Sequence, residues 1–261
     1  MASLYDRADI YDLIESESRW NLFKTHWENI LRGRDIETLL DVSIGSGSAT
    51  LQLAELGVRL SGSDLSGDML EKCGGKAAAR GLSVDLKRCD FRTVGEHFSG
   101  PFDCVASTGN SLPYVSNDDV LKTLEQMDSL VKPSGYLYFE IRNWDKILRE
   151  KQRFYLYSPF FDRDTRINLV QVWDYHQDGS MTFNLLYTFE KDNRIFQKEV
   201  FEEHYQPIGR AVMLDKLKAM RYGDIQILNY PSQFQKIPPE DADWYCVIGR
   251  KNQGGRDESH R

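Results

Sequence analysis

Apolar and polar positions along the chain repeat with different spacings in different regions. Near the amino end, residues 4–17 and 19–32 place apolar and aromatic side chains at helical spacing, which predicts two helices. From residue 38 onward, short apolar runs alternate with helical patterns. The runs lie near 38–43, 58–63, 83–88, 102–107 and 135–141, and the helical patterns near 47–56, 66–79 and 117–131. This alternation predicts a parallel sheet with helices on both faces.

The spacing changes again between residues 153 and 206. Segments 167–173, 181–187 and 198–205 look like antiparallel strands, and turn residues at 177–180 separate the first two. A helix over 209–220 and strands near 224–230 and 243–249 return the chain to the main sheet. We therefore predict an α/β, doubly wound fold with a mostly parallel seven-stranded sheet. The predicted divisions are amino-terminal helices over 1–36, the sheet core over 37–150 and 207–251, an inserted antiparallel cap over 151–206 and a flexible tail over 252–261.

The loop after the first predicted strand carries the strongest chemical signal. The apolar run ends there in the small residues 43–48, where Gly45 and Gly47 let a ligand approach the backbone without a Cβ in the way. Residues 49–56 read as a helix whose amino end points at the site. Asp64 ends the next strand, where a carboxylate can accept hydrogen bonds from both ribose hydroxyls. Together these features predict a nucleoside-bearing cofactor.

Composition limits the classes of partner. The 261 residues, 41% of them hydrophobic, can form one large domain, or a domain with a lid, and the net charge of -7 argues against nucleic acid as the main partner. The amino terminus lacks a basic region followed by an apolar one, and no apolar run of about 18 residues occurs. We expect a cytoplasmic protein with no membrane partner, and a homo-oligomer stays open. Neither the histidines nor the cysteines have metal-ligand spacing, so no metal is expected. The cysteines, which we expect to be buried thiols, are Cys73, Cys89, Cys104 and Cys246.

The form of the loop distinguishes between cofactors. A dinucleotide fingerprint needs a third glycine where Thr50 stands. The Asp-x-small-x-Gly-x-Gly form that begins at Asp41 resembles motif I of the class I S-adenosylmethionine-dependent methyltransferases. The resemblance implies a Rossmann-like methyltransferase fold and S-adenosyl-L-methionine as cofactor, with its amino-acid part on the loop. Ser43 replaces the first glycine, as small residues also do in the glycine N-methyltransferases.

Further segments are similar to the family's cofactor motifs. Asp64-Leu65 looks like the ribose-binding acidic loop, and the resemblance places Met69 on adenine. It also implies that Asp90 hydrogen-bonds the adenine amino group and that Phe91 flanks the ring. The cofactor-binding residues that the resemblance implies are Tyr5, Arg19, Asp41, Ser43, Gly45, Asp64, Leu65, Met69, Asp90, Phe91, Thr108 and Gly109. Local alternatives remain, because Asp64 could be a helix cap, Met69 core packing and Asp90 a turn cap.

Two segments resemble the glycine and glycine/sarcosine N-methyltransferases more closely. Residues 108–112 look like their Gly-Asn-Ser segment, and residues 142–148 like their Arg-Asn-aromatic-Asp segment. The resemblance implies that Arg142 pairs with a substrate carboxylate and that Asn110 helps to fix it, for which an arginine fork is suited. The alternative without a functional role is that Asn110 caps the end of a strand and Arg142 forms an ion pair at the surface. The remaining candidates for the catalytic site are Tyr205 and Tyr157, with Tyr155 as an alternative to Tyr157.

The predicted function is methyl transfer to the amine of a small molecule, most simply an amino acid such as glycine or sarcosine. Tyr114 stands where the resembling family has a histidine, and Glu202 and Glu203 make the strand before Tyr205 more acidic. These departures keep amino sugars and other amines without a carboxylate open. A non-catalytic S-adenosylmethionine-binding protein and a nicotinamide-dependent oxidoreductase are further alternatives, and an O-methyltransferase is a weaker one.

Overall fold

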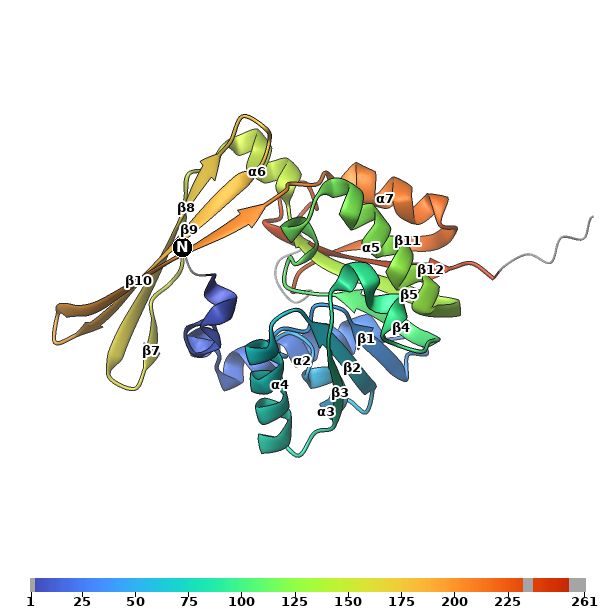
Figure 1. Ribbon diagram of the computed structural model, residues 1–261, viewed down its shortest axis with the longest axis horizontal. Coiled ribbons are helices and arrows are strands. Elements are labelled where there is room, and N and C mark those ends of the chain that lie inside the picture. Colours follow the sequence, from blue (N-terminus) through green and yellow to red (C-terminus); the bar gives the residue numbers. More distant parts are fainter. Residues whose placement is uncertain (1–2, 232–236, 254–261) are drawn as a thin grey trace, which may run out of the picture.

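Two sheets lie side by side in the computed structural model, which describes residues 3–231 and 237–253 (Figure 1). The larger sheet contains β1 (Thr38–Asp41), β2 (Arg59–Asp64), β3 (Val84–Arg88), β4 (Phe102–Ser107), β5 (Val131–Arg142), β11 (Tyr222–Asn229) and β12 (Trp244–Lys251). Its order is β11-β12-β5-β4-β1-β2-β3, and β12 runs antiparallel to both neighbours. The other pairs are parallel, so the predicted mostly parallel seven-stranded sheet is confirmed.

Helices cover both faces of this sheet. On one face α2 (Glu17–Leu31), α3 (Gln52–Glu55) and α4 (Gly67–Ala79) bury side chains against β1, β2 and β4. On the other face lie α5 (Asn117–Leu130) and α7 (Arg210–Ala219). Three helices begin at a serine whose Oγ accepts an N–H three residues further on, which satisfies one of the free donors of the first turn. These serines are Ser16, Ser66 and Ser116.

The second sheet is antiparallel and follows α6 (Trp144–Glu150). It contains β6 (Phe154–Leu156), β7 (Phe160–Asp162), β8 (Thr165–Tyr175), β9 (Met181–Lys191) and β10 (Arg194–Tyr205), in the order β10-β9-β8-β6 with β7 paired to β8. Burial alternates along β8, where Ile167, Leu169 and Trp173 are buried and their neighbours are partly exposed. This alternation is typical of a sheet with one covered face. We call this sheet the cap sheet.

Two predicted helices differ from the structure. Residues 4–17 form η1 (Leu4–Asp6), α1 (Ala8–Tyr11) and η2 (Asp12–Ile14) rather than one helix. Tertiary hydrogen bonds outweigh helix propensity here, because Leu4 N donates to Glu203 on β10. Over 47–56 only α3 is helical, since Gly47 has a φ of 78° and turns the chain before it. The sequence patterns also missed α6, β6, β7, η3 (Phe91–Glu96) and η4 (Leu112–Tyr114).

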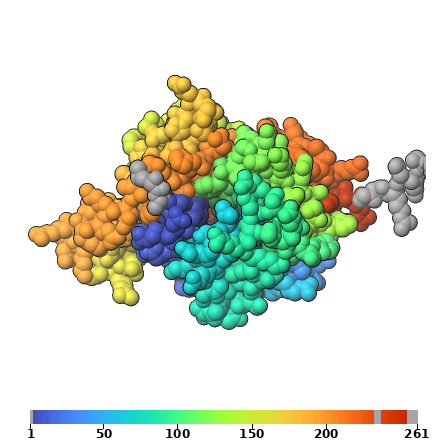
Figure 2. Space-filling view, in the orientation of Figure 1, coloured from blue at the N-terminus to red at the C-terminus, as the bar shows by residue number. Residues whose placement is uncertain are grey.

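The amino-terminal segment lies between the two sheets. In Figure 1 its dark blue turns stand between the cap sheet and α4, and η1 contacts both β10 and α4. Figure 2 shows the same residues at the surface of this junction. Within the described ranges, no helix is long and apolar enough to cross a membrane. Residues 254–261 of the predicted tail lie outside the described residues.

Candidate functional site

A cavity of about 470 Å³ lies at the carboxyl ends of β1, β2, β4 and β5, where open α/β sheets bind ligands. The cap sheet and the amino-terminal segment form its other walls. Most of the predicted site residues line it. They are Tyr5, Arg19, Ser43, Gly45, Asp64, Thr108, Gly109, Asn110, Arg142, Tyr157 and Tyr205.

The loop after β1 is fixed by a fully buried carboxylate. Asp41 accepts hydrogen bonds from Ser43 N at 3.0 Å, Thr50 Oγ1 at 3.1 Å and Thr108 Oγ1 at 2.7 Å. Burial raises the pKa of Asp41 to about 6, and these donors oppose the rise. The carboxylate thus joins the loop after β1 to the residue that follows β4, and it does not itself line the cavity.

Asp64 presents a partly exposed carboxylate to the cavity. Gly45 N donates to its Oδ2 at 2.9 Å and Ser66 N to its Oδ1 at 2.9 Å. Each oxygen keeps lone pairs for a further donor, as two vicinal hydroxyls require. Burial raises the pKa of this carboxyl, and the backbone donors oppose the rise. The cap of the following helix is Ser66, so the carboxylate of Asp64 is left to face the cavity.

The five other predicted cofactor residues do not line the cavity. Leu65 is 64% exposed, whereas Met69 and Asp41 are fully buried. The Asp90 carboxylate accepts hydrogen bonds from Arg92 N and from the Arg92 guanidinium, and Phe91 packs against the core. The structure therefore shows local protein partners for Asp90, as the turn-cap alternative requires.

Asn110 stands at a strained turn directly after β4. Its φ is 60°, and Gly109 before it has a φ of 73°, so two consecutive residues adopt the left-handed region. Asn110 Oδ1 accepts the Arg142 N–H at 3.0 Å. Its Nδ2 is buried and has no hydrogen-bond partner among the described residues. A buried amide donor without a partner is costly, and here it lies in a cavity wall.

Arg142, the last residue of β5, holds a buried cation. The guanidinium carbon lies 4.7 to 5.5 Å from the ring centroids of four aromatic residues, which are Tyr155, Trp173, Phe183 and Trp244. Its hydrogen bonds to Tyr157 and Gln171 are long, at 3.4 Å each. Within residues 3–231 and 237–253, no carboxylate lies within ion-pair distance of it. A buried cation held by rings and neutral acceptors can receive an anion.

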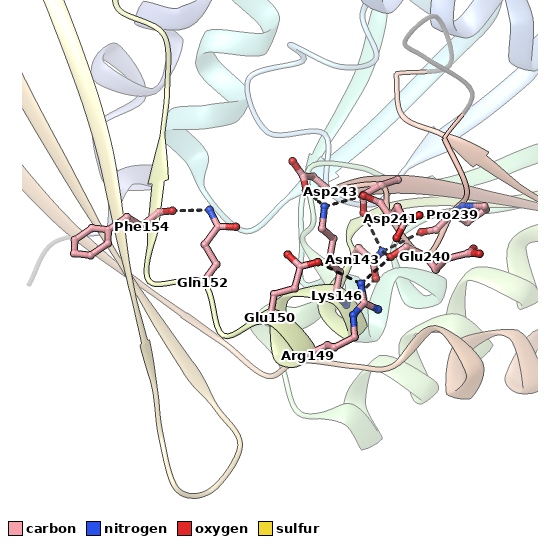
Figure 3. Close-up of polar contacts among 11 residues, drawn as sticks. Asn143, Lys146, Arg149, Glu150, Gln152, Phe154, Pro239, Glu240, Asp241 and Asp243 are labelled. Atoms are coloured by element: carbon pink, nitrogen blue, oxygen red, sulfur yellow. Dashed lines mark hydrogen bonds and ion pairs between the residues drawn. The ribbon is translucent and has the colours of Figure 1, made fainter.

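The residue after Arg142 fixes the start of α6. Asn143 Oδ1 accepts the Lys146 N–H, and its Nδ2 donates to three backbone carbonyls between β11 and β12 (Figure 3). Lys146 adds an ion pair to Asp243 at 2.8 Å. These contacts hold the end of β5 in place. In this segment Arg142 therefore faces the cavity, and Asn143 anchors the end of β5.

A tyrosine cluster closes the side of the cavity next to the cap sheet. The Tyr114 hydroxyl lies 2.6 Å from that of Tyr205 and 3.2 Å from that of Tyr5. Burial raises the pKa of each of these phenols, so all three are neutral. Glu203 on β10 accepts hydrogen bonds from Ser3 Oγ at 2.9 Å and Leu4 N at 2.7 Å. It therefore ties the amino-terminal segment across the cavity.

Glu140 is the residue that the sequence patterns missed. It lines the cavity, is 3% exposed and accepts the Gly109 N–H at 2.8 Å. Burial raises its pKa to about 8. A signal was present, because Glu140 interrupts an apolar run and stands two residues before Arg142, on the same face of a strand.

Comparison with known proteins shows which proteins this chain resembles. Residues 39–135 match the model of a methyltransferase domain. The chain thus contains a segment similar to a methyltransferase domain, and the proteins that it resembles include S-adenosylmethionine-dependent methyltransferases. The chain is 26% identical over 254 residues to the glycine/sarcosine/dimethylglycine N-methyltransferase of Actinopolyspora halophila, a match that spans 95% of the chain but only 42% of that relative.

Solved structures show the same fold at low sequence identity. The chain superimposes on an S-adenosylmethionine-dependent methyltransferase from Clostridium acetobutylicum with a TM-score of 0.73, at 16% identity over 95% of this chain and 98% of the other. It also matches an amino pentose methyltransferase from Micromonospora echinaspora, with a TM-score of 0.70, at 14% identity over 97% and 98% of the two chains. The match to a methyltransferase domain favours S-adenosylmethionine over the nicotinamide cofactor that the sequence left open.

Proposed function

We propose that this protein transfers a methyl group from S-adenosylmethionine to the amine of a small molecule that carries a carboxylate, such as the amino acids glycine or sarcosine. The observation that carries this proposal is the buried guanidinium of Arg142, which faces the cavity without an anionic partner among the described residues. Asn110 Nδ2 is a second unpaired donor in the same wall. A substrate carboxylate satisfies both groups.

The residues at the cofactor end of the cavity fit an adenosyl group with an amino-acid tail. Asp64 holds the ribose hydroxyls, and the loop of Ser43 and Gly45 approaches the tail. Thr108 and Gly109 line the opposite side, while Tyr5 and Arg19 cover the ligand from the amino-terminal segment and α2. We keep Leu65, Met69, Asp90 and Phe91 at the adenine end in this proposal, although they do not line the cavity. A Cβ on Gly47 would lie 2.6 Å from the Leu51 side chain, so this position in the loop has no room for a residue larger than glycine.

The protein's contribution to the reaction is to orient the amine and exclude water. When bound, the cofactor supplies an activated methyl, so no metal or dedicated acid is needed. Arg142 and Asn110 hold the carboxylate, and Tyr205 and Tyr157 accept hydrogen bonds from the substrate amine through their hydroxyl oxygens. The cap sheet and the tied amino-terminal segment keep the site dry. The substrate ammonium loses its proton to water before it is enclosed.

A methyl-transfer screen tests this function. Purified protein is incubated with labelled S-adenosylmethionine and glycine, sarcosine, larger amino acids, simple amines or amino sugars. We expect product with at least one amino acid and less product with the matched amine that lacks the carboxylate. If no amine is methylated although the cofactor binds, the chain is a non-catalytic binding protein and the proposal is wrong.

A second candidate substrate is an amino sugar or another amine without a carboxylate. Glu203 favours it, because this buried carboxylate lies beside Tyr205 in the cavity wall and suits a cationic substrate. The structural match to an amino pentose methyltransferase concerns the fold alone. Methylation of amino sugars but not of amino acids in the same screen would favour this candidate.

A further inference from the structure

Glu140 is a buried carboxyl that the proposed reaction does not use. Gly109 N donates to its Oε1 at 2.8 Å and the Tyr138 hydroxyl to its Oε2 at 3.1 Å, and Tyr230 adds a side-chain hydrogen bond. All of these donors are neutral. In the part of the chain that the structure describes, no lysine, arginine or histidine forms an ion pair with it. Without a cation beside it this buried carboxyl keeps its proton at neutral pH, and a bound cation would favour its ionised form.

The charged groups around Glu140 do not supply that cation. His26 Nε2 lies 2.9 Å from the Tyr138 hydroxyl, but burial lowers the pKa of His26 to about 3, so its ring is neutral. Asp41 lies close enough to raise the pKa of Glu140 further. Arg142 is two residues along β5 and lies among the aromatic rings toward the cap sheet.

The position of Tyr230 connects Glu140 to the cofactor end of the cavity. Tyr230 stacks on Phe23 with ring centroids 5.9 Å apart, and the Arg19 guanidinium lies 4.8 Å from the Phe23 ring. Glu140 and Arg19 both affect the pKa of the Tyr230 phenol, one raising it and the other lowering it. Glu140, Tyr230 and Arg19 all line the cavity, and Arg19 also pairs with Glu15 at 3.4 Å.

The amino-acid tail of S-adenosylmethionine is a zwitterion with the matching pair of charges. We propose that Glu140 binds the ammonium group of this tail while Arg19 binds its carboxylate. This inference rests on the proposed function. The Thr108 carbonyl, a neutral acceptor in the same wall, already accepts hydrogen bonds from Ser43 Oγ at 3.1 Å and Ser111 Oγ at 2.8 Å. Glu140 keeps lone pairs for a further donor, and an ammonium group beside it would hold it in the ionised form.

Calorimetric titration with two ligands tests the assignment. One ligand is S-adenosylhomocysteine, and the other is its analogue that lacks only the α-amino group. The wild-type protein should bind the first about 10- to 100-fold more tightly, since hydrogen bonds to charged groups are among the stronger ones. Glu140→Gln should lose most of that preference and keep the affinity for the analogue. Glu150→Gln, on α6 and exposed, is the matched control and should behave as the wild type.

Four other results of these measurements would contradict the assignment of Glu140 or the proposed function. Equal binding of both ligands by the wild-type protein overturns the assignment without any variant. A Glu140→Gln protein that loses affinity for both ligands equally shows that Glu140 only supports the Gly109 turn. Unchanged affinity for S-adenosylhomocysteine with a raised KM for the amine places the substrate, and not the cofactor, on Glu140. A wild-type protein that binds neither ligand refutes the proposed function itself.

Discussion

Arg142→Met separates a substrate-binding role for this arginine from a structural one. Methionine is neutral, flexible and close in volume, so the four surrounding rings keep their packing. Two parallel hydrogen bonds from the guanidinium to a carboxylate contribute about 3 kcal/mol at the lower end of their range. Their loss should raise KM for a carboxylate-bearing amine by at least about 100-fold. The affinity for S-adenosylhomocysteine should stay within about twofold of the wild type.

The same substitution makes a distinctive prediction for stability. Burying the cation costs several kcal/mol, and contacts with aromatic rings return about 0.5–2 kcal/mol each. Since four rings offset this cost, the free energy of unfolding without ligand should change by less than about 1 kcal/mol. Breaking a buried ion pair would instead cost about 3–5 kcal/mol.

Steady-state kinetics and denaturant unfolding together decide the outcome. Arg149→Met is the matched control, because Arg149 is on α6, half exposed and paired only with Glu150 at 3.3 Å among the ion pairs of the described residues. It should change neither KM nor stability. An Arg142→Met protein with an unchanged KM, or with a large loss of stability, would refute the carboxylate site.

Three further predictions concern acidic residues. Asp64→Ala should weaken S-adenosylhomocysteine binding by about 10- to 100-fold in calorimetry, whereas Asp68→Ala, exposed on the next helix, should not; equal affinities would remove Asp64 from the site. The unfolding free energy of the ligand-free protein should fall by up to about 1.4 kcal/mol per pH unit between about pH 6.5 and 8, because burial raises the pKa of Glu140 to about 8 and the folded protein keeps a proton that the unfolded chain has lost. Glu140→Gln should remove this slope, and equal slopes in the wild type and the variant would contradict the raised pKa of Glu140. Glu203→Gln should speed hydrogen exchange in η1, while Glu202→Gln, on the other face of β10, should leave it unchanged; equal exchange in both would mean that Glu203 does not tie this segment.

The main sheet could be predicted from the sequence because its signal is local. Each buried parallel strand is a short apolar run, and in each helix that covers the sheet apolar residues recur about every four positions. The short strands β6 and β7 and the short helix α6 lack enough residues to show a period. The amino-terminal turns were predicted as one helix because their shape depends on a contact that the local pattern does not contain, the bond from Leu4 N to Glu203.

The sequence could predict where the site lies, but it could not predict the hydrogen-bond partners of the residues in it. Asn110 follows β4 and Arg142 ends β5, and the two lie together because the carboxyl ends of these adjacent parallel strands share one edge. Spacing does not show which lone pairs are already used. Asp41 thus has the expected position in the loop, yet its carboxylate is occupied by Ser43, Thr50 and Thr108.

The central claim is that the cavity binds S-adenosylmethionine, and direct calorimetric titration with its demethylated product tests this most simply. S-adenosylhomocysteine should bind with a Kd in the micromolar range, about -8 kcal/mol, and NAD should give no measurable heat. Binding of NAD with no heat from S-adenosylhomocysteine would contradict the account.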